Sequence, residues 1–202
     1  MRVITLPQRA NGEISILKAL LEGPDVLVHI RKPTLSRVEL SRYMAQFSAF
    51  ERRRMVLHQH LELVADLGML HIHHSTSIRQ RLLAQDSSTT SLTSTSTHSW
   101  EEFNELPSFY RSAFVSPVFP SISKQNYGKD QQVSLTGRKN THSLAVALGG
   151  ISSQSIHRLG GSDFQDFALC GTIWEAHSPL DETKKCQEIF QSLSFQNPNH
   201  VF

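Results

Sequence analysis

The sequence has few cysteines, almost no net charge and no long apolar run. Its two cysteines, Cys170 and Cys186, are too few for a disulfide framework, so we expect both to be reduced. Twenty Lys and Arg against eighteen Asp and Glu leave a formal charge of +2, which argues against a nucleic-acid partner or an anionic membrane surface. No apolar run approaches the ~20 residues of a membrane span, and the start MRVITLPQR lacks the apolar segment of a secretory signal. We therefore expect a cytoplasmic protein.

The 202 residues are 39% hydrophobic and 19% charged, which is typical of a globular protein with a substantial core. No linker divides the chain, so we predict one domain over residues 1–202. The tract 87–99 has eleven Ser or Thr among thirteen residues. We predict a strand there rather than a linker, because Thr favours strands and the tract leads into the cap-like Ser99-Trp100-Glu101-Glu102. We interpret the run Arg52 to Arg54 as a solvated patch.

Apolar runs of the β type alternate with segments of helical periodicity, which predicts parallel strands joined by helices. Eight strands favour a closed (β/α)8 barrel, in which some helices must be short because 202 residues are few for that fold. A doubly wound open sheet is the alternative. The predicted strands are 3–6, 26–30, 55–58, 69–72, 89–93, 112–115, 144–148 and 167–170. The predicted helices include 15–21, 35–47, 75–84, 100–106 and 153–159, whereas 61–67 and 134–141 have weak helical patterns.

The residues after the strands should line the site, because barrels bind ligands at the carboxyl ends of their strands. Strands seven and eight end in glycine turns, Gly149-Gly150 and Cys170-Gly171, where backbone N–H groups can approach a phosphate. Strands two to five end in basic and hydroxyl side chains: His29, Arg31, Lys32, His58, His60, His71, His73, His74, Ser94, Ser96, Thr97 and His98.

The stretch 116–128, SPVFPSISKQNYG, follows strand six and joins an apolar run to a loop bounded by prolines. Pro117 and Pro120 end the strand, because neither has an N–H to donate to a ladder. Ser121 and Ser123 offer hydroxyls and Lys124 a mobile positive charge. We predict that Lys124 adds a second contact to the anion site.

The histidines after strands two to four raise the question of a metal. His71 and His73 share one face of a strand by its period of two, and His58 lies on the neighbouring strand, so three imidazoles would suit zinc or another borderline metal. No carboxylate stands at these strand ends, and alternating histidines equally suit a hydrogen-bonding pocket wall. From the sequence we assign no metal.

Several of these motifs resemble those of thiamine phosphate synthases and the related TenI thiazole tautomerases. Residues 116–124, SPVFPSISK, resemble the family's G-P-x-[FY]-P-T-x-[ST]-K loop, and LGGI at 148–151 resembles its I-G-G-I. HIRK at 29–32, LHIH at 70–73, STHS at 96–99 and LCGTI at 169–173 are similar to its other strand ends.

The resemblance implies an enzyme that joins hydroxymethylpyrimidine diphosphate to thiazole phosphate and releases diphosphate, assisted by magnesium. It implies that Arg31, Ser96 and Lys124 hold the pyrimidine diphosphate, and that Ser121 and Ser123 face the thiazole phosphate. The phosphate of the latter would lie on Gly150, Cys170 and Gly171. We take Lys124, Arg31 and His58 as catalytic candidates. The substrate-binding candidates are His29, Lys32, His73, Ser96, Thr97, Ser121, Ser123, Gly149, Gly150, Cys170 and Gly171.

The sequence also departs from the family's pattern. His58-Gln59 replaces the Asn-Asp pair after strand three, and Thr76 stands where a second Asp is expected, so the usual magnesium ligands are not evident. Pro117 occupies the position of the tautomerase's catalytic histidine. Three functions stay open: a synthase, an isomerase using His58, His73 or His98, and a barrel that only binds thiazole or thiamine phosphate. A homo-oligomer also stays open.

Overall fold

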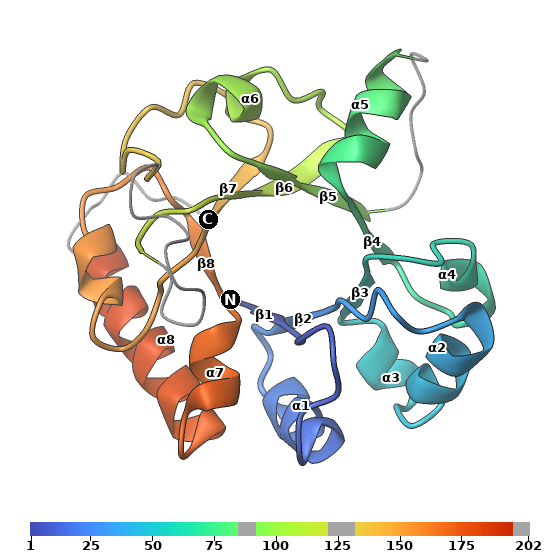
Figure 1. Ribbon diagram of the computed structural model, residues 1–202. Helices are drawn as coiled ribbons and strands as arrows, with labels where there is room; N and C mark the ends of the chain where they lie inside the picture. The colour runs from blue at the N-terminus through green and yellow to red at the C-terminus, as the bar shows by residue number, and fades with distance from the viewer. Residues whose placement is uncertain (85–91, 121–131, 196–202) are drawn as a thin grey trace.

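The protein folds as a closed barrel of eight parallel strands (Figure 1). The computed structural model describes residues 1–84, 92–120 and 132–195. Strand order follows chain order, and β8 closes the ring on β1 by pairing Leu169 with Val3. The predicted (β/α)8 barrel is confirmed and the open sheet is excluded. The strands are β1 (Arg2–Ile4), β2 (Leu27–Ile30), β3 (Met55–Leu57), β4 (His71–His74), β5 (Leu92–Thr97), β6 (Tyr110–Val115), β7 (Leu144–Leu148) and β8 (Asp166–Leu169).

The helices lie outside the ring of strands (Figure 1). In the described part of the connection between β6 and β7, residues 116–120 and 132–143, the chain forms no helix. Within the described ranges we find no helical segment that combines the length and apolarity of a bilayer span. The helices are α1 (Glu13–Glu22), α2 (Arg37–Met44), α3 (Ala49–Arg52), α4 (Leu63–Asp66), α5 (Thr76–Ala84), α6 (Trp100–Asn104), the 3₁₀ helix η1 (Ile156–Leu159), α7 (Gly171–Glu175) and α8 (Pro179–Phe195).

Side chains alternate along the strands between two cores, as the period of two requires. Outward residues such as Val28, Val115 and Ala147 are buried in the large core between barrel and helices. Inward residues of β1, β6, β7 and β8 form a smaller apolar cluster inside the barrel, made of Ile4, Phe114, Val146 and Ala168. The interior facing β2 to β5 carries polar side chains instead, among them His29, His73 and Ser94.

Two strands extend farther along the chain than predicted. β4 covers His71–His74 rather than 69–72, and β5 covers Leu92–Thr97 rather than 89–93, of which 89–91 lie outside the described residues. The Ser/Thr tract is a strand over this range, as predicted, and Ser99 caps α6 by accepting a hydrogen bond from the Glu102 N–H at 3.2 Å. His73 and Ser96 consequently lie inside strands rather than after them.

The arginine run corrects another expectation, because only Arg53 is a solvated side chain. Arg54 donates to the carbonyls of Leu21 and Gly23 at the end of α1. Arg52 donates to the carbonyls of Phe47 and Leu67, at 2.6 and 2.9 Å. These two guanidiniums satisfy carbonyls that a helix end or a turn leaves without a partner, so their role is structural. Cys170 and Cys186 are not joined in a disulfide, in line with the expectation that both are reduced.

Candidate functional site

A cavity of about 380 Å³ opens at the carboxyl ends of the strands. This is where barrel folds bind their ligands, and the volume suits a small organic molecule. Among the described residues that line it, Arg31 is the one Lys or Arg, and none is Asp or Glu. The lining consists of Ile4, Arg31, His58, His73, Ser75, Thr76, Ser96, His98, Phe114, Ser116, Leu148, Gly149, Gly150, Ile151, Ala168, Cys170, Gly171 and Thr172.

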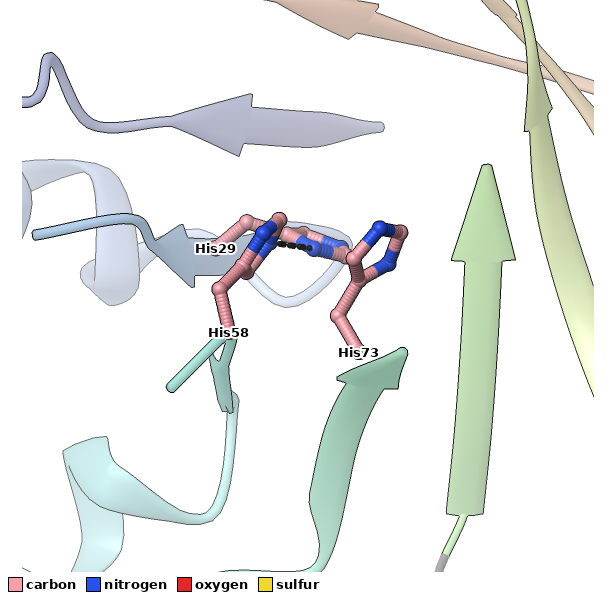
Figure 2. A group of neighbouring side chains, drawn as sticks. All are labelled: His29, His58 and His73. Carbon is pink, nitrogen blue, oxygen red and sulfur yellow. Dashed lines mark hydrogen bonds between the residues drawn. The ribbon is translucent and has the colours of Figure 1, made fainter. Parts of the chain in front are cut away.

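Three histidines from adjacent strands form one cluster on the polar side of the barrel (Figure 2). His29 belongs to β2, His58 follows β3 and His73 belongs to β4. His29 Nδ1 lies 3.0 Å from His58 Nε2, and the rings of His58 and His73 stack with centroids 4.1 Å apart. Each histidine offers one nitrogen, and these nitrogens all lie within 4.8 Å of one another.

Two serines of β5 hold the third histidine. His73 Nδ1 lies 2.9 Å from Ser94 Oγ, and its Nε2 lies 3.0 Å from Ser96 Oγ. Ser94 also donates to the Ile72 carbonyl at 3.2 Å. Because a hydroxyl has one proton, Ser94 Oγ accepts from the Nδ1–H of His73, and the lone pair of His73 is then on Nε2, toward Ser96.

Burial keeps the cluster neutral. Desolvation, with a smaller effect of the Arg31 charge, lowers the pKa of His58 to about 3. Desolvation and the neighbouring histidines also lower the pKa of His29 and of His73 well below the usual value. Near neutral pH these rings are therefore uncharged imidazoles whose lone pairs can accept a hydrogen bond or bind a metal, not cations that attract phosphate. Arg31 carries the positive charge of the described lining.

The Gly149-Gly150 turn after β7 packs tightly against the loop after β6. Both glycines have positive φ, +104° and +62°. A Cβ on Gly149 would lie 3.0 Å from Pro117, and one on Gly150 would lie 2.3 Å from the Pro120 carbonyl oxygen. No side chain fits there, so glycine lets the two loops meet at the cavity wall.

The same turn has its hydrogen-bond acceptors occupied. The four carbonyls of residues 148–151 each accept a hydrogen bond from the protein. The donors are the amides of Val118 and Phe119 and the hydroxyls of Ser155 and Thr172. An anion beside this turn would therefore meet fewer repelling carbonyl lone pairs, which suits a phosphate.

Most predicted site residues in the described ranges meet at this cavity. Lys124, Ser121 and Ser123 lie outside the described residues, so their roles stay predictions. His29 is buried below the lining and reaches the cavity through His58. The predicted residues that line the cavity are Arg31, His58, His73, Ser96, Gly149, Gly150, Cys170 and Gly171.

Lys32 does not belong to the cavity, which corrects the sequence interpretation. Its Nζ is buried and donates to Glu13 Oε2 at 2.7 Å and to the carbonyls of Leu6 and Gln8 at 2.8 and 2.9 Å. The Tyr43 hydroxyl donates to the other oxygen of Glu13 at 2.7 Å. All three ammonium protons are used, so Lys32 ties the loop after β1 to α1 and has none left for a substrate.

Thr97 is the second correction. It is fully buried and its Oγ1 donates to the Phe114 carbonyl at 3.1 Å, away from the cavity lining. The inward positions of β5 are Ser94 and Ser96, and odd positions face outward. Strand alternation was also the signal for two roles that the sequence analysis did not assign. Ser94, expected only as a lining residue, is a partner of His73, and Phe114 lines the cavity as an apolar side chain.

No protein-family model and no curated protein matches the sequence. Solved structures do match. The thiamine phosphate pyrophosphorylase of Bacteroides thetaiotaomicron has a TM-score of 0.68 at 21% identity over 98% of both chains. That of Pyrococcus furiosus has a TM-score of 0.71 at 16% identity over 95% of both chains. The chain has the thiamine phosphate pyrophosphorylase fold. The KGPDC of Streptococcus mutans is less similar, with a TM-score of 0.55 at 10% identity over 95% of this chain and 97% of that one. At the level of the fold, the family resemblance is confirmed.

Proposed function

We propose that the cavity binds the phosphate esters from which thiamine phosphate is made, and that the protein is a thiamine-biosynthesis enzyme of the synthase type. The observation that carries the proposal is the pairing of two features in one cavity. Arg31 contributes a positive charge from the end of β2, and the Gly149-Gly150 turn contributes a wall free of side chains. A phosphate ester presents the negative charge and the compact shape that these two features accommodate.

The residues present suggest how a coupling reaction would be assisted. As diphosphate leaves a pyrimidine, negative charge builds on its oxygens, and the Arg31 guanidinium is placed to neutralise it. The apolar floor of Phe114, Leu148 and Ile151 would receive the uncharged rings. Lys124 stays a predicted second cation from the loop after β6.

Magnesium is expected from the family resemblance, and the described residues do not fit it. Mg²⁺ requires oxygen ligands in octahedral geometry, usually with one or two carboxylates. The described lining holds no carboxylate, and His58 stands where the family has an Asn-Asp pair. We therefore derive no step through magnesium.

A specific observation favours a second candidate, an isomerase acting on the thiazole phosphate. His58, His73 and His98 line the cavity, where an imidazole can act as acid or base on a bound substrate. Burial lowers the pKa of His58 and of His73, which makes these two rings weak bases. The third candidate is a barrel that binds these phosphates without turnover, and it would form no product.

One experiment separates these candidates. Calorimetry would measure the binding of thiazole phosphate and of pyrimidine diphosphate separately, and a mixture with Mg²⁺ would be followed for thiamine phosphate. Coupling supports the synthase, isomerised thiazole without coupling supports the isomerase, and binding without turnover supports the third reading. A chain that binds neither phosphate would refute the proposal.

Arg31→Ala tests the charge that the proposal places in the cavity. We expect pyrimidine diphosphate to bind at least about 10-fold more weakly, since a hydrogen bond to a charged group contributes about 1.5–3 kcal/mol. Arg53→Ala is the matched control, because it removes the same charge from an exposed side chain outside the cavity. Equal affinities in the two variants would contradict the role of Arg31.

A further inference from the structure

We propose that His29, His58 and His73 form a binding site for a borderline divalent transition metal, with Zn²⁺ as the first candidate and one coordination position open to the cavity. The proposal goes beyond the proposed function, since it concerns the metal alone. The three side chains come from adjacent strands, so the barrel itself holds their backbones in place (Figure 2).

The distances are close to those that a metal requires. Zinc binds imidazole nitrogen at about 2.0–2.1 Å, so two nitrogens of a tetrahedral site lie about 3.3 Å apart. His29 Nδ1 and His58 Nε2 are 3.0 Å apart. One nitrogen from each of the three rings lies within 4.8 Å of the others, so the rings would draw closer for all three to bind one ion. Because two uncharged rings at 3.0 Å share a single proton between them, a metal ion would take the place of that proton.

His73 is prepared as a ligand by its neighbour. Ser94, whose proton goes to the Ile72 carbonyl, accepts from His73 Nδ1–H and leaves the lone pair on Nε2. The Ser96 hydroxyl lies 3.0 Å from Nε2 and donates to this lone pair, so a metal would take the place of that hydrogen bond. A protein group that holds the far nitrogen of a ligating histidine fixes the tautomer and the orientation of the ring. Ser94 fills this role here.

The second independent observation is an unpartnered nitrogen. His29 is 1% exposed, and its Nε2 has no hydrogen-bond partner among the described residues. A buried polar atom without a partner costs free energy, and such atoms are uncommon in folded proteins. A metal on Nδ1 would leave this Nε2 as it is, so the unpartnered nitrogen is not itself a ligand. It shows that hydrogen bonds do not hold His29 on both sides, as they would a purely structural histidine.

The donor set selects the class of metal. Three imidazoles without a described carboxylate suit Zn²⁺, Co²⁺, Ni²⁺ or Cu²⁺ and disfavour Mg²⁺ and Ca²⁺. His58 and His73 also line the cavity, so the remaining coordination position faces a bound molecule. The rings of His58 and His73 are stacked at 20°, and their lone pairs converge on one ion only if the stack opens.

The test uses the full chain without a histidine tag, freed of metal by a chelator. Zn²⁺ is titrated by calorimetry and Co²⁺ by its visible absorption, which is intense for a tetrahedral site. We expect one ion per chain and no competition from millimolar Mg²⁺. His58→Gln and His29→Gln should each weaken binding at least about 100-fold, since even the loss of a group that orients a ligand costs 10–100-fold.

His157→Gln is the matched control, because His157 is exposed and lies outside the cluster. It should bind Zn²⁺ as the unaltered chain does. Ser94→Ala keeps all three ligands and should bind about 10-fold more weakly, which tests the site even if a histidine variant misfolds. The proposal is overturned if the unaltered chain binds no Co²⁺ or Zn²⁺, or if Ser94→Ala and the cluster variants that fold bind as well as the control. Neither result depends on thiazole phosphate or pyrimidine diphosphate.

Discussion

Gly150→Ala should destabilise the fold more than Gly68→Ala, although both glycines have a left-handed backbone. Gly150 and Gly68 share a φ of +62°, but only Gly150 is crowded. The left-handed conformation costs an alanine about 1–2 kcal/mol, and the stiffer unfolded chain returns about 0.4–1 kcal/mol. Gly68→Ala has nothing within 4 Å of its new methyl group, so we expect a net loss of about 1 kcal/mol.

The methyl group of Gly150→Ala would lie 2.3 Å from the Pro120 carbonyl oxygen and 2.8 Å from Phe119 Cβ. Forcing these groups apart adds about 1–3 kcal/mol, giving a total loss of about 2–4 kcal/mol. Urea unfolding of the two variants, followed by far-UV circular dichroism, measures the difference. Equal losses would show that the loop after β6 moves away freely, and would refute the argument that close packing of the two loops requires glycine.

Two further predictions concern buried charge and pH. Lys32→Met leaves the Glu13 carboxylate buried without its partner, so the free energy of unfolding measured in urea should fall by about 3–5 kcal/mol. The double variant Lys32→Met with Glu13→Leu removes both charges and should recover most of that loss. If the double variant folds but no longer binds phosphate, Lys32 belongs to the site after all. His58 stays neutral in the folded chain down to a pKa of about 3 but takes up a proton near pH 6.5 when unfolded. The unfolded state therefore binds more protons in this window, and the free energy of unfolding should fall as the pH falls from about 6.5 to about 3, by up to about 1.4 kcal/mol per pH unit for His58. Unfolding at pH 7.5, 6 and 5 should show a shallower fall for His58→Gln, and equal slopes would contradict the assignment.

The barrel was predictable because most of its strands are short apolar runs separated by helical or turn segments, whereas β4 and β5 are polar. β7 lies at residues 144–148, as predicted, since Leu144 to Leu148 is apolar on both faces. The helix α8 was missed. Its core-facing residues are Thr183 and Cys186, which are buried, and Ile189, Phe190 and Leu193, which pack against the core. The helical spacing of the last three from Cys186 was a signal that the sequence interpretation did not use. The helix is also held by Glu182, which accepts from the Ser153 amide at 2.7 Å and from its hydroxyl at 2.9 Å, a contact that no local pattern indicates.

In the site, the sequence indicated which face a residue occupies better than how deep it lies. Because side chains alternate with a period of two, an error of two residues in the bounds of β4 still placed His71 and His73 on the inner face. The same error placed the two histidines at the wrong depth along the barrel axis. His71 lies toward the amino ends of the strands beside Arg2 and Arg111, whereas His73 reaches the cavity. The third partner is therefore His29 rather than His71.

Inside the barrel, the contrast between the two sides bears on function. A barrel needs no polar interior for stability, and the cluster of Ile4, Phe114, Val146 and Ala168 shows that this chain fills one side with apolar side chains. Polar side chains on the other side must be hydrogen-bonded or cost stability. The serines of β5 satisfy His73, but His29 keeps one buried nitrogen without a partner in the described part of the chain. Hydrophobic replacement would remove that cost, so we expect the retained imidazoles to serve a bound group, and their nitrogens suit the metal proposed above better than a phosphate.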